Sequence, residues 1–253
     1  MKIKQILLTL IILVATCMPV YAENQANTKM IALKQAAEKG DVDALNAIAG
    51  MYYRGEGVKQ DYTKALGYYQ QAADKGHVLA LNNIAGMYYN GEGVPQNYTK
   101  ALEYGQQAAD KGHVRALNAI AEMYHDGQGV KQDYSKALEY YQKAAEKGHT
   151  GAIYNLGGMY YDGDGVTQDY VKALEYYQKA AEKGKTEAIF NMGVMYDHGR
   201  GVAQDYAKAL DYHQQAAEQG HAGAMNNIGV MYKNGEGVKQ DYAKVLEYYQ
   251  QAA

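Results

Sequence analysis

The sequence predicts an all-α protein, a right-handed α/α solenoid (superhelix) of six 36-residue helical hairpins preceded by an N-terminal capping helix. Three observations predict this fold. The octapeptide at residues 55–62 returns unchanged at residues 235–242, and its second glycine recurs every 36 residues, a period typical of stacked repeats. Apolar residues follow a helical spacing on both sides of each copy. The only cysteine is Cys17, so packing rather than disulfide bonds has to stabilise the array.

Residues 1–22 are predicted to be a signal peptide that is removed after export. Lys2 and Lys4 precede an apolar run at residues 6–15, which is too short to span a bilayer, and small residues before Ala22 form a cleavage site. We expect a protein of the periplasm or of the secreted fraction. The alternative is a lipoprotein signal, in which Cys17 carries the lipid anchor.

Charge and motifs exclude several classes of function. The formal net charge of −3 becomes −5 without the two signal lysines, and no basic cluster stands out, which argues against nucleic acid or an anionic membrane surface as the partner. No later segment resembles a membrane span. Paired glycines such as Gly55 and Gly57 have no preceding strand and no following Lys-Ser or Lys-Thr pair, so they predict no phosphate loop. We expect no cofactor.

The first hairpin, residues 41–76, illustrates the unit. Its first half has helical apolar spacing, and Gly55 stands where a left-handed residue commonly ends a helix. Asp61 stands at the N-cap of the second helix, which closes at Gly76. The remaining hairpins are predicted at residues 77–112, 113–148, 149–184, 185–220 and 221–253.

The two ends of the array differ. Residues 28–40 resemble a second helix without its first, so we expect residues 23–40 to form a capping helix that covers the first hairpin. The sequence stops within the last second helix at Ala253. We expect that end either to fray or to contact a partner, another copy, or further sequence beyond Ala253.

The repeated frame resembles the Sel-1-like repeat, a relative of the tetratricopeptide repeat. The resemblance extends from Thr28 to Ala253, and its clearest copy consists of residues 144–148, 155–160, 163–166 and 169–173. It implies an α/α solenoid that scaffolds protein–protein contacts, as in exported bacterial proteins and eukaryotic quality-control adaptors. Some cysteine-rich secreted members are credited with binding or slowly hydrolysing β-lactams. Those members staple each hairpin with a disulfide, and this chain has no such cysteines.

In the related tetratricopeptide units the first helices line a concave side, and the matching positions here predict a binding groove. Asparagine can donate to and accept from a peptide backbone, while a tyrosine face holds an apolar side chain or a sugar ring. From the first to the fourth hairpin these positions are amide and aromatic, with little charge. The candidate binding residues are Asn46, Tyr53, Asn82, Tyr89, Asn118, His125, Tyr154, Tyr161 and Phe190.

Glycines in the middle of first helices sharpen the groove hypothesis. Gly50, Gly86 and Gly158 occupy one repeat position, and each costs about 1 kcal/mol of helix stability relative to alanine. They predict either the floor of a ligand groove or close packing of successive helices; copying from an ancestral unit is the third alternative.

The histidines predict turns rather than chemistry. His77, His113, His149 and His221 recur after the closing glycine, a spacing that fits a helix start better than a metal site, because residues one repeat apart lie too far from each other to share an ion. His125, His198 and His213 suggest no catalytic triad. We therefore expect no metal site and no catalytic residue.

These observations favour an exported, non-enzymatic adaptor or receptor. Its expected partner is a protein, bound through an extended segment or a loop, because the groove positions offer no pair of basic residues for a terminal carboxylate. Two alternatives stay open: binding of a glycan such as a cell-wall fragment, and weak activity towards β-lactams.

Overall fold

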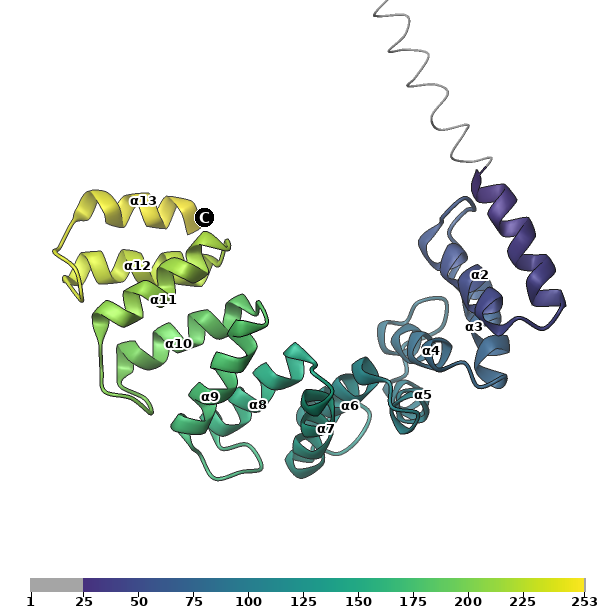
Figure 1. The fold of residues 1–253 in the computed structure, drawn as a ribbon, viewed down its shortest axis with the longest axis horizontal. Helices are drawn as coiled ribbons and strands as arrows, with labels where there is room; N and C mark the ends of the chain where they lie inside the picture. Colours follow the sequence, from purple (N-terminus) through teal and green to yellow (C-terminus); the bar gives the residue numbers. More distant parts are fainter. Residues whose placement is uncertain (1–24, 253) are drawn as a thin grey trace, which may run out of the picture. The chain divides into compact units, whose positions relative to one another are not determined.

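The structure, a computed structural model, describes residues 25–252, which form helices joined by turns and contain no strand. Residues 25–38 are helical. The helices that follow are α2 (Val42–Arg54), α3 (Tyr62–Asp74), α4 (Val78–Asn90), α5 (Tyr98–Asp110), α6 (Val114–Asp126), α7 (Tyr134–Glu146), α8 (Thr150–Asp162), α9 (Tyr170–Glu182), α10 (Thr186–His198), α11 (Tyr206–Glu218), α12 (Ala222–Asn234) and α13 (Tyr242–Ala252) (Figure 1). They pair into six hairpins, which confirms the predicted all-α repeat fold. The predicted signal peptide, including Cys17, lies outside the described residues.

The chain divides into two compact units within α6, the first ending at Ala116 and the second starting at Leu117. The first unit contains the hairpins α2–α3 and α4–α5. The second contains α7 and the hairpins α8–α9, α10–α11 and α12–α13. Within each unit the two helices of a hairpin pack against each other, and the second helix also contacts the first helix of the next hairpin. Successive hairpins therefore cover each other's apolar sides.

The loop inside each hairpin explains the repeated octapeptide. Gly55 ends α2 in the left-handed conformation, with φ of 71°, and its N–H bonds the carbonyl of Met51. Asp61 caps α3 by accepting a hydrogen bond from the N–H of Lys64 at 2.9 Å. Both roles were predicted, whereas that of Gln60 was not: its Nε2 donates to the carbonyl of Tyr53 at 2.9 Å. The equivalent bond forms at Gln96, Gln132, Gln168, Gln204 and Gln240.

The helix at residues 25–38 caps the first hairpin, as predicted. Its Met30 is buried in a cluster with Ile48 and Met51 of α2. Gly57, in the first loop, lies directly against Ala26, just as the equivalent Gly93 of the second hairpin lies against Tyr62 at the start of α3. This N-terminal helix therefore takes the place of a preceding second helix.

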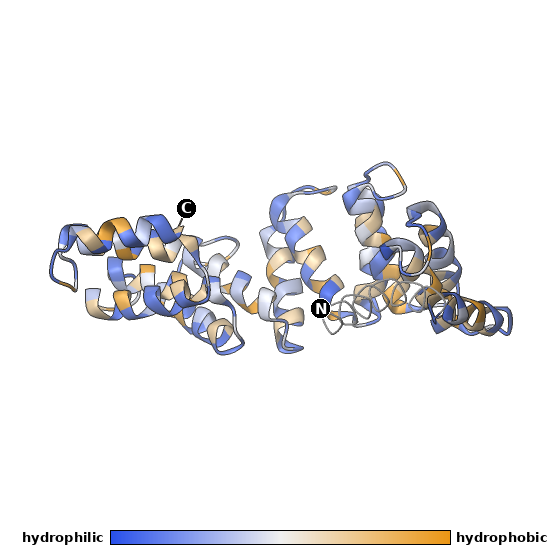
Figure 2. Ribbon diagram, turned by 90° about the horizontal axis from the view of Figure 1, so that it is seen from above, coloured by the Kyte–Doolittle hydropathy of each residue, from blue (hydrophilic) through white to orange (hydrophobic). Residues whose placement is uncertain are grey.

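Small and aromatic side chains fill the hairpins. The alanines equivalent to Ala65 are almost fully buried in α3, α5, α7, α9 and α11, which allows close approach of neighbouring helices. Tyr52 stacks on Tyr68 with ring centroids 5.8 Å apart, and the Lys64 ammonium lies 5.5 Å from the Tyr52 ring. This arrangement recurs in all six hairpins. In Figure 2 the helices carry the hydrophobic stretches, while the connecting loops are mostly hydrophilic.

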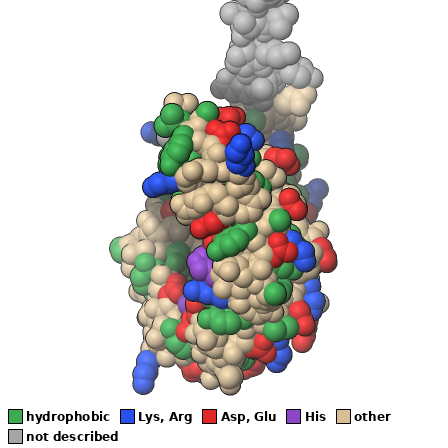
Figure 3. Space-filling view, turned by 90° about the vertical axis from the view of Figure 1, so that its left-hand side faces the viewer, with side chains coloured by type: hydrophobic (Ala, Val, Ile, Leu, Met, Phe, Trp, Pro, Cys, Tyr) green, Lys and Arg blue, Asp and Glu red, His purple; other side chains and the backbone are tan. Residues whose placement is uncertain are grey.

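Helix α13 carries exposed apolar side chains. Leu246 is 64% exposed, whereas its equivalent Leu210 in α11 is 8% exposed because it belongs to a cluster with residues of α12. The space-filling view of this side of the molecule shows hydrophobic side chains interspersed with charged ones (Figure 3). Within residues 25–252, none of the helices has both the length and the apolar character that crossing a membrane requires.

Candidate functional site

The predicted groove residues lie on the first helices of the hairpins, and we call the surface that they occupy on either unit its first-helix face. The residues fall into three rows, each with one residue per hairpin, named after their members in α2. Row 46 is Asn46, Asn82, Asn118, Tyr154, Phe190 and Asn226; row 50 is Gly50, Gly86, Glu122, Gly158, Val194 and Val230; row 53 is Tyr53, Tyr89, His125, Tyr161, Asp197 and Lys233. Most members are half-buried.

In the first unit, Tyr53 contacts the loop of the next hairpin. Its hydroxyl donates a hydrogen bond of 2.8 Å to Glu92 Oε2. Burial raises the pKa of Tyr53 to about 12, and the bond to Glu92 is the next cause. The ring packs edge-on against Tyr62 at 5.2 Å. The hydroxyl is therefore held by Glu92, a residue that lies outside the predicted rows.

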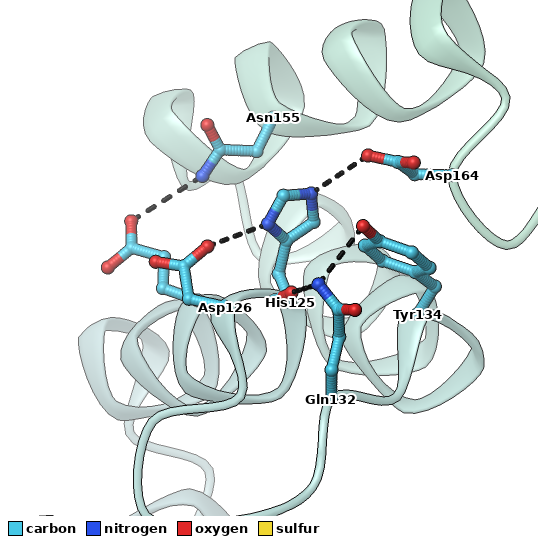
Figure 4. A network of polar contacts seen from close by, with 7 residues as sticks. His125, Asp126, Gln132, Tyr134, Asn155 and Asp164 are labelled. Atoms are coloured by element: carbon cyan, nitrogen blue, oxygen red, sulfur yellow. Dashed lines mark hydrogen bonds and ion pairs between the residues drawn. The ribbon is translucent and has the colours of Figure 1, made fainter.

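The equivalent position in the second unit is His125, at the centre of a polar network (Figure 4). Its Nδ1 lies 2.8 Å from Asp126 Oδ1, and its Nε2 lies 3.2 Å from Asp164 Oδ2. A neutral imidazole donates to one of these carboxylates, and an imidazolium donates to both. The ring also packs edge-on against Tyr134 at 5.1 Å. His125 thus contacts the next loop in the same manner as Tyr53.

Glu122, the one acidic member of row 50, accepts hydrogen bonds from two asparagines. Asn118 Nδ2 donates to its Oε1 at 2.9 Å, and Asn155 Nδ2 approaches the same oxygen at 3.5 Å. The Oδ1 atoms of Asn118 and of its equivalent Asn46 are buried and have no hydrogen-bond partner among the described residues. Row 46 therefore carries carboxamides whose hydrogen-bonding capacity is only partly used.

The face is more acidic in the second unit than the rows alone predict. Asp126 and Asp164 add carboxylates beside His125, and Asp162 adds a third nearby. Burial raises the pKa of Asp162, and repulsion from Asp164 raises it further. Sequence reasoning missed this charge because these residues stand one or three positions after row 53.

Three aromatic candidates make contacts between hairpins. Tyr154 accepts a hydrogen bond of 3.1 Å from Asn191 Nδ2, and its ring lies 5.5 Å from that of Tyr177. Phe190 stacks on His221 at 4.4 Å. The guanidinium of Arg200 lies 5.2 Å from the Tyr161 ring. Other residues of the protein therefore already contact these three rings.

The glycines of row 50 have no packing role. A Cβ atom added to Gly86 would have no heavy atom within 4 Å, and one added to Gly158 would meet only the Tyr177 hydroxyl at 3.9 Å. At Gly50 it would meet the flexible guanidinium of Arg54 at 3.2 Å. Close packing of successive helices therefore does not explain these three residues.

A different set of glycines is required by packing. A Cβ atom on Gly157 would lie 2.7 Å from the ring of Tyr177, and the same conflict arises between Gly193 and His213 and between Gly229 and Tyr249. We call these glycines and the aromatic residues that they contact the hairpin seam.

The seam also joins successive hairpins through asparagines that sequence reasoning missed. Asn83, Asn155 and Asn191 hydrogen-bond to the buried Tyr69, Tyr141 and Tyr177 of the preceding hairpin. Gly105 takes the place of the tyrosine in the second hairpin, and Ala119 takes the place of the asparagine in the third hairpin. Because both partners of one pair are absent together, the sequence contains a signal for this pairing.

The recurring histidines begin helices, as predicted. His77 Nδ1 accepts a hydrogen bond from the N–H of Ala80 at 3.1 Å, and His113, His149 and His221 make the same bond at 3.1–3.3 Å. Lys185, at the equivalent position, makes no side-chain cap. In the described part of the chain, no three His, Cys, Asp or Glu side chains are arranged to hold a metal ion.

A model of the Sel1 repeat matches residues 42–77, 78–113, 114–149, 150–185, 186–221 and 222–253. The chain belongs to the Sel1 repeat family. Proteins of this family are generally scaffolds for protein–protein interaction and are typically not catalytic. None of the curated proteins compared with this Sel1 array matches it.

Solved structures give the same fold. The array is 35% identical to c5321, a protective antigen of uropathogenic Escherichia coli with an SLR fold, with a TM-score of 0.84 over 88% of this chain and 48% of that one. It therefore spans about half the length of c5321. A Sel1 repeat protein from Oxalobacter formigenes is 28% identical, with a TM-score of 0.82 over 94% and 96% of the two chains. The Pseudomonas aeruginosa immunity protein PA5088, 24% identical with a TM-score of 0.54 over 81% of each chain, shares the fold.

Proposed function

We propose that this Sel1 array is an exported, non-enzymatic adaptor or receptor that binds an extended protein segment along its first-helix face. The observation that carries the proposal is the open space above Gly86 and Gly158. A glycine in a helix interior costs about 1 kcal/mol relative to alanine, and at these positions no packing contact compensates for it. A backbone free of side chains allows a partner's main chain to approach closely.

The residues beside these glycines suit a peptide. Row 46 supplies carboxamides, which can pair with both the N–H and the C=O of an extended chain. In the second unit the carboxylates of Glu122, Asp126 and Asp164 favour a segment that carries a lysine or an arginine there.

A pull-down from envelope extract tests the proposal. Wild-type protein and a variant with Asn82→Ala and Tyr89→Ala are used as bait, and recovered proteins are identified by mass spectrometry and mapped by cross-linking. We expect cross-links from the first helices of the wild type, and recovery at least tenfold lower with the variant. Equal recovery of every partner by a variant with an unchanged helical spectrum would overturn the proposal.

Glycan binding is the second candidate. The contacts that the tyrosine rings make within the protein limit which of them could stack on a sugar. A sugar ring stacks on an aromatic face, but Tyr52 and its equivalents in the other hairpins are stacked between a lysine and another tyrosine. Tyr53 and Tyr89 pack edge-on against Tyr62 and Tyr98, which makes them the tyrosines to test for a glycan. Co-sedimentation with purified cell wall tests this candidate. Retention that depends on these two tyrosines would favour it over a protein partner.

Activity towards β-lactams is the third candidate and is favoured only by the family resemblance. The three rows contain no serine, threonine or cysteine that could act as an acyl-accepting nucleophile. Nitrocefin turnover at the background rate is the expected result. Turnover that is abolished by Tyr53→Phe or His125→Gln would instead establish an enzyme.

Export is the remaining part of the proposal. N-terminal sequencing of the processed protein from a periplasmic fraction is expected to start at Glu23, after cleavage at Ala22. A protein that retains Met1, or one that starts at a lipidated Cys17, would contradict soluble export.

A further inference from the structure

His213 lies in the hairpin seam of α11, at a position that tyrosine occupies in four other hairpins, as Tyr69, Tyr141, Tyr177 and Tyr249. Tyr69, Tyr141 and Tyr177 are each 3% exposed, and His213 is fully buried. A titratable group has therefore replaced a hydroxyl that stays neutral at all ordinary pH values.

The imidazole is tightly enclosed and poorly satisfied. Its Nε2 lies 3.3 Å from Asn227 Nδ2 in α12, which is the interaction that the tyrosines make with their asparagines. Its Nδ1 has no hydrogen-bond partner among the described residues. Phe190 lies 5.5 Å from the ring, and a Cβ atom on Gly193 would lie 2.7 Å from Nδ1. The described residues therefore offer Nδ1 no hydrogen-bond acceptor.

The charged groups around His213 oppose its protonation. Two titratable residues act on it: His221, at the N-cap of α12, and His198, at the end of α10. Asp197 lies 3.4 Å from His198, and the carboxylate of Glu187 interacts with His221. Burial, followed by the two histidines, lowers the pKa of His213 to about 4.

We propose that His213 is an acid-sensitive lock between the fifth and sixth hairpins. The neutral ring holds α11 against α10 and α12, and protonation releases α12 and α13. When the seam opens, the ring returns to water and to its ordinary pKa of 6.5. The open form therefore binds a proton below pH 6.5 while the packed form does not, so acid favours opening. Between pH 7 and pH 5 this linkage raises the opening equilibrium constant about twentyfold.

Hydrogen exchange measured by mass spectrometry on the full chain tests the lock, because α8 serves as an internal control. Its junction with α7 is closed by Tyr141, which does not titrate in this range. We expect the protection factors of α12 to fall about twentyfold more than those of α8 between pH 7 and pH 5. His213→Tyr, which restores the residue of the other hairpins, is expected to remove this excess. His125→Tyr makes the same change on the first-helix face and should leave it intact.

The lock is overturned if α8 and α12 lose protection equally in the wild type, or if His213→Tyr retains the wild-type pH profile. Should that variant fail to fold, a titration of the wild-type imidazole by nuclear magnetic resonance gives an independent answer. A midpoint near 4 for His213 supports the lock, and a midpoint near 6.5 contradicts it. The proposal does not depend on the identity of the partner, so its failure leaves the proposed binding function untouched.

Discussion

Gly157 and Gly158 are consecutive residues of α8, yet a methyl group added to each would meet opposite surroundings. At Gly157 it would lie 2.7 Å from the Tyr177 ring, and at Gly158 its nearest neighbour is the Tyr177 hydroxyl at 3.9 Å. One glycine belongs to the hairpin seam, and the other belongs to the first-helix face. The difference teaches that the repeat separates residues that stabilise the stack from residues that remain available to a partner.

The largest effect is expected where the seam loses its aromatic residue. Tyr177→Ala removes a buried ring and its bond to Asn191, which should lower the free energy of unfolding by about 3–5 kcal/mol. Tyr177→Phe, which keeps the ring, should cost about 1 kcal/mol. Urea denaturation followed by circular dichroism measures both. Equal losses for the two variants would show that the ring does not stabilise the seam.

Adding a single methyl group to Gly157 or to Gly158 tests whether the two glycines have different roles. Gly157→Ala should destabilise the protein by about 1–3 kcal/mol through overpacking against Tyr177. Gly158→Ala should stabilise it by up to about 1 kcal/mol, because alanine is the better helix former and the space is open. Thermal unfolding of the two variants side by side is the measurement. Shifts of the same sign would contradict the distinction between seam and face.

Substitutions at helix N-caps should change the stability of the protein by a smaller amount and should leave partner binding unchanged. Lys185→His should create the cap that His149 provides for α8 and raise stability by about 1 kcal/mol. His149→Ala should lose a similar amount. Melting temperatures check both changes, with partner recovery expected to stay at the wild-type level. A change in recovery without a change in stability would place the N-cap positions in the binding site.

Much of the fold could be predicted because its signals are local. The left-handed Gly55 and the N-caps Asp61 and His77 each depend on a few neighbouring residues, and the 36-residue period supplies the rest. The capping helix also followed, because residues 28–40 copy the pattern of a second helix.

The seam and the contacts of the face could not be predicted because they depend on how one hairpin meets the next. The bond from Tyr53 to Glu92 joins residues 39 positions apart, which no helical period indicates. Gly157 and Gly158 differ by one step of helix phase, about 100°, and apolar patterning does not resolve that difference. For the same reason, the sequence alone indicates no role for His213. Only the structure places it at the position of the buried tyrosines.

The most direct test of the proposed face uses two open glycines, one on it and one away from it. Gly86 in α4 and Gly67 in α3 both lie in helix interiors with no heavy atom within 4 Å of an added Cβ. Gly86→Leu and Gly67→Leu should therefore stabilise the protein similarly, by about 0.5–1 kcal/mol. Partner recovery from envelope extract is expected to fall at least tenfold with Gly86→Leu and to stay unchanged with Gly67→Leu. Full recovery by the stably folded Gly86→Leu variant would contradict binding along the first helices.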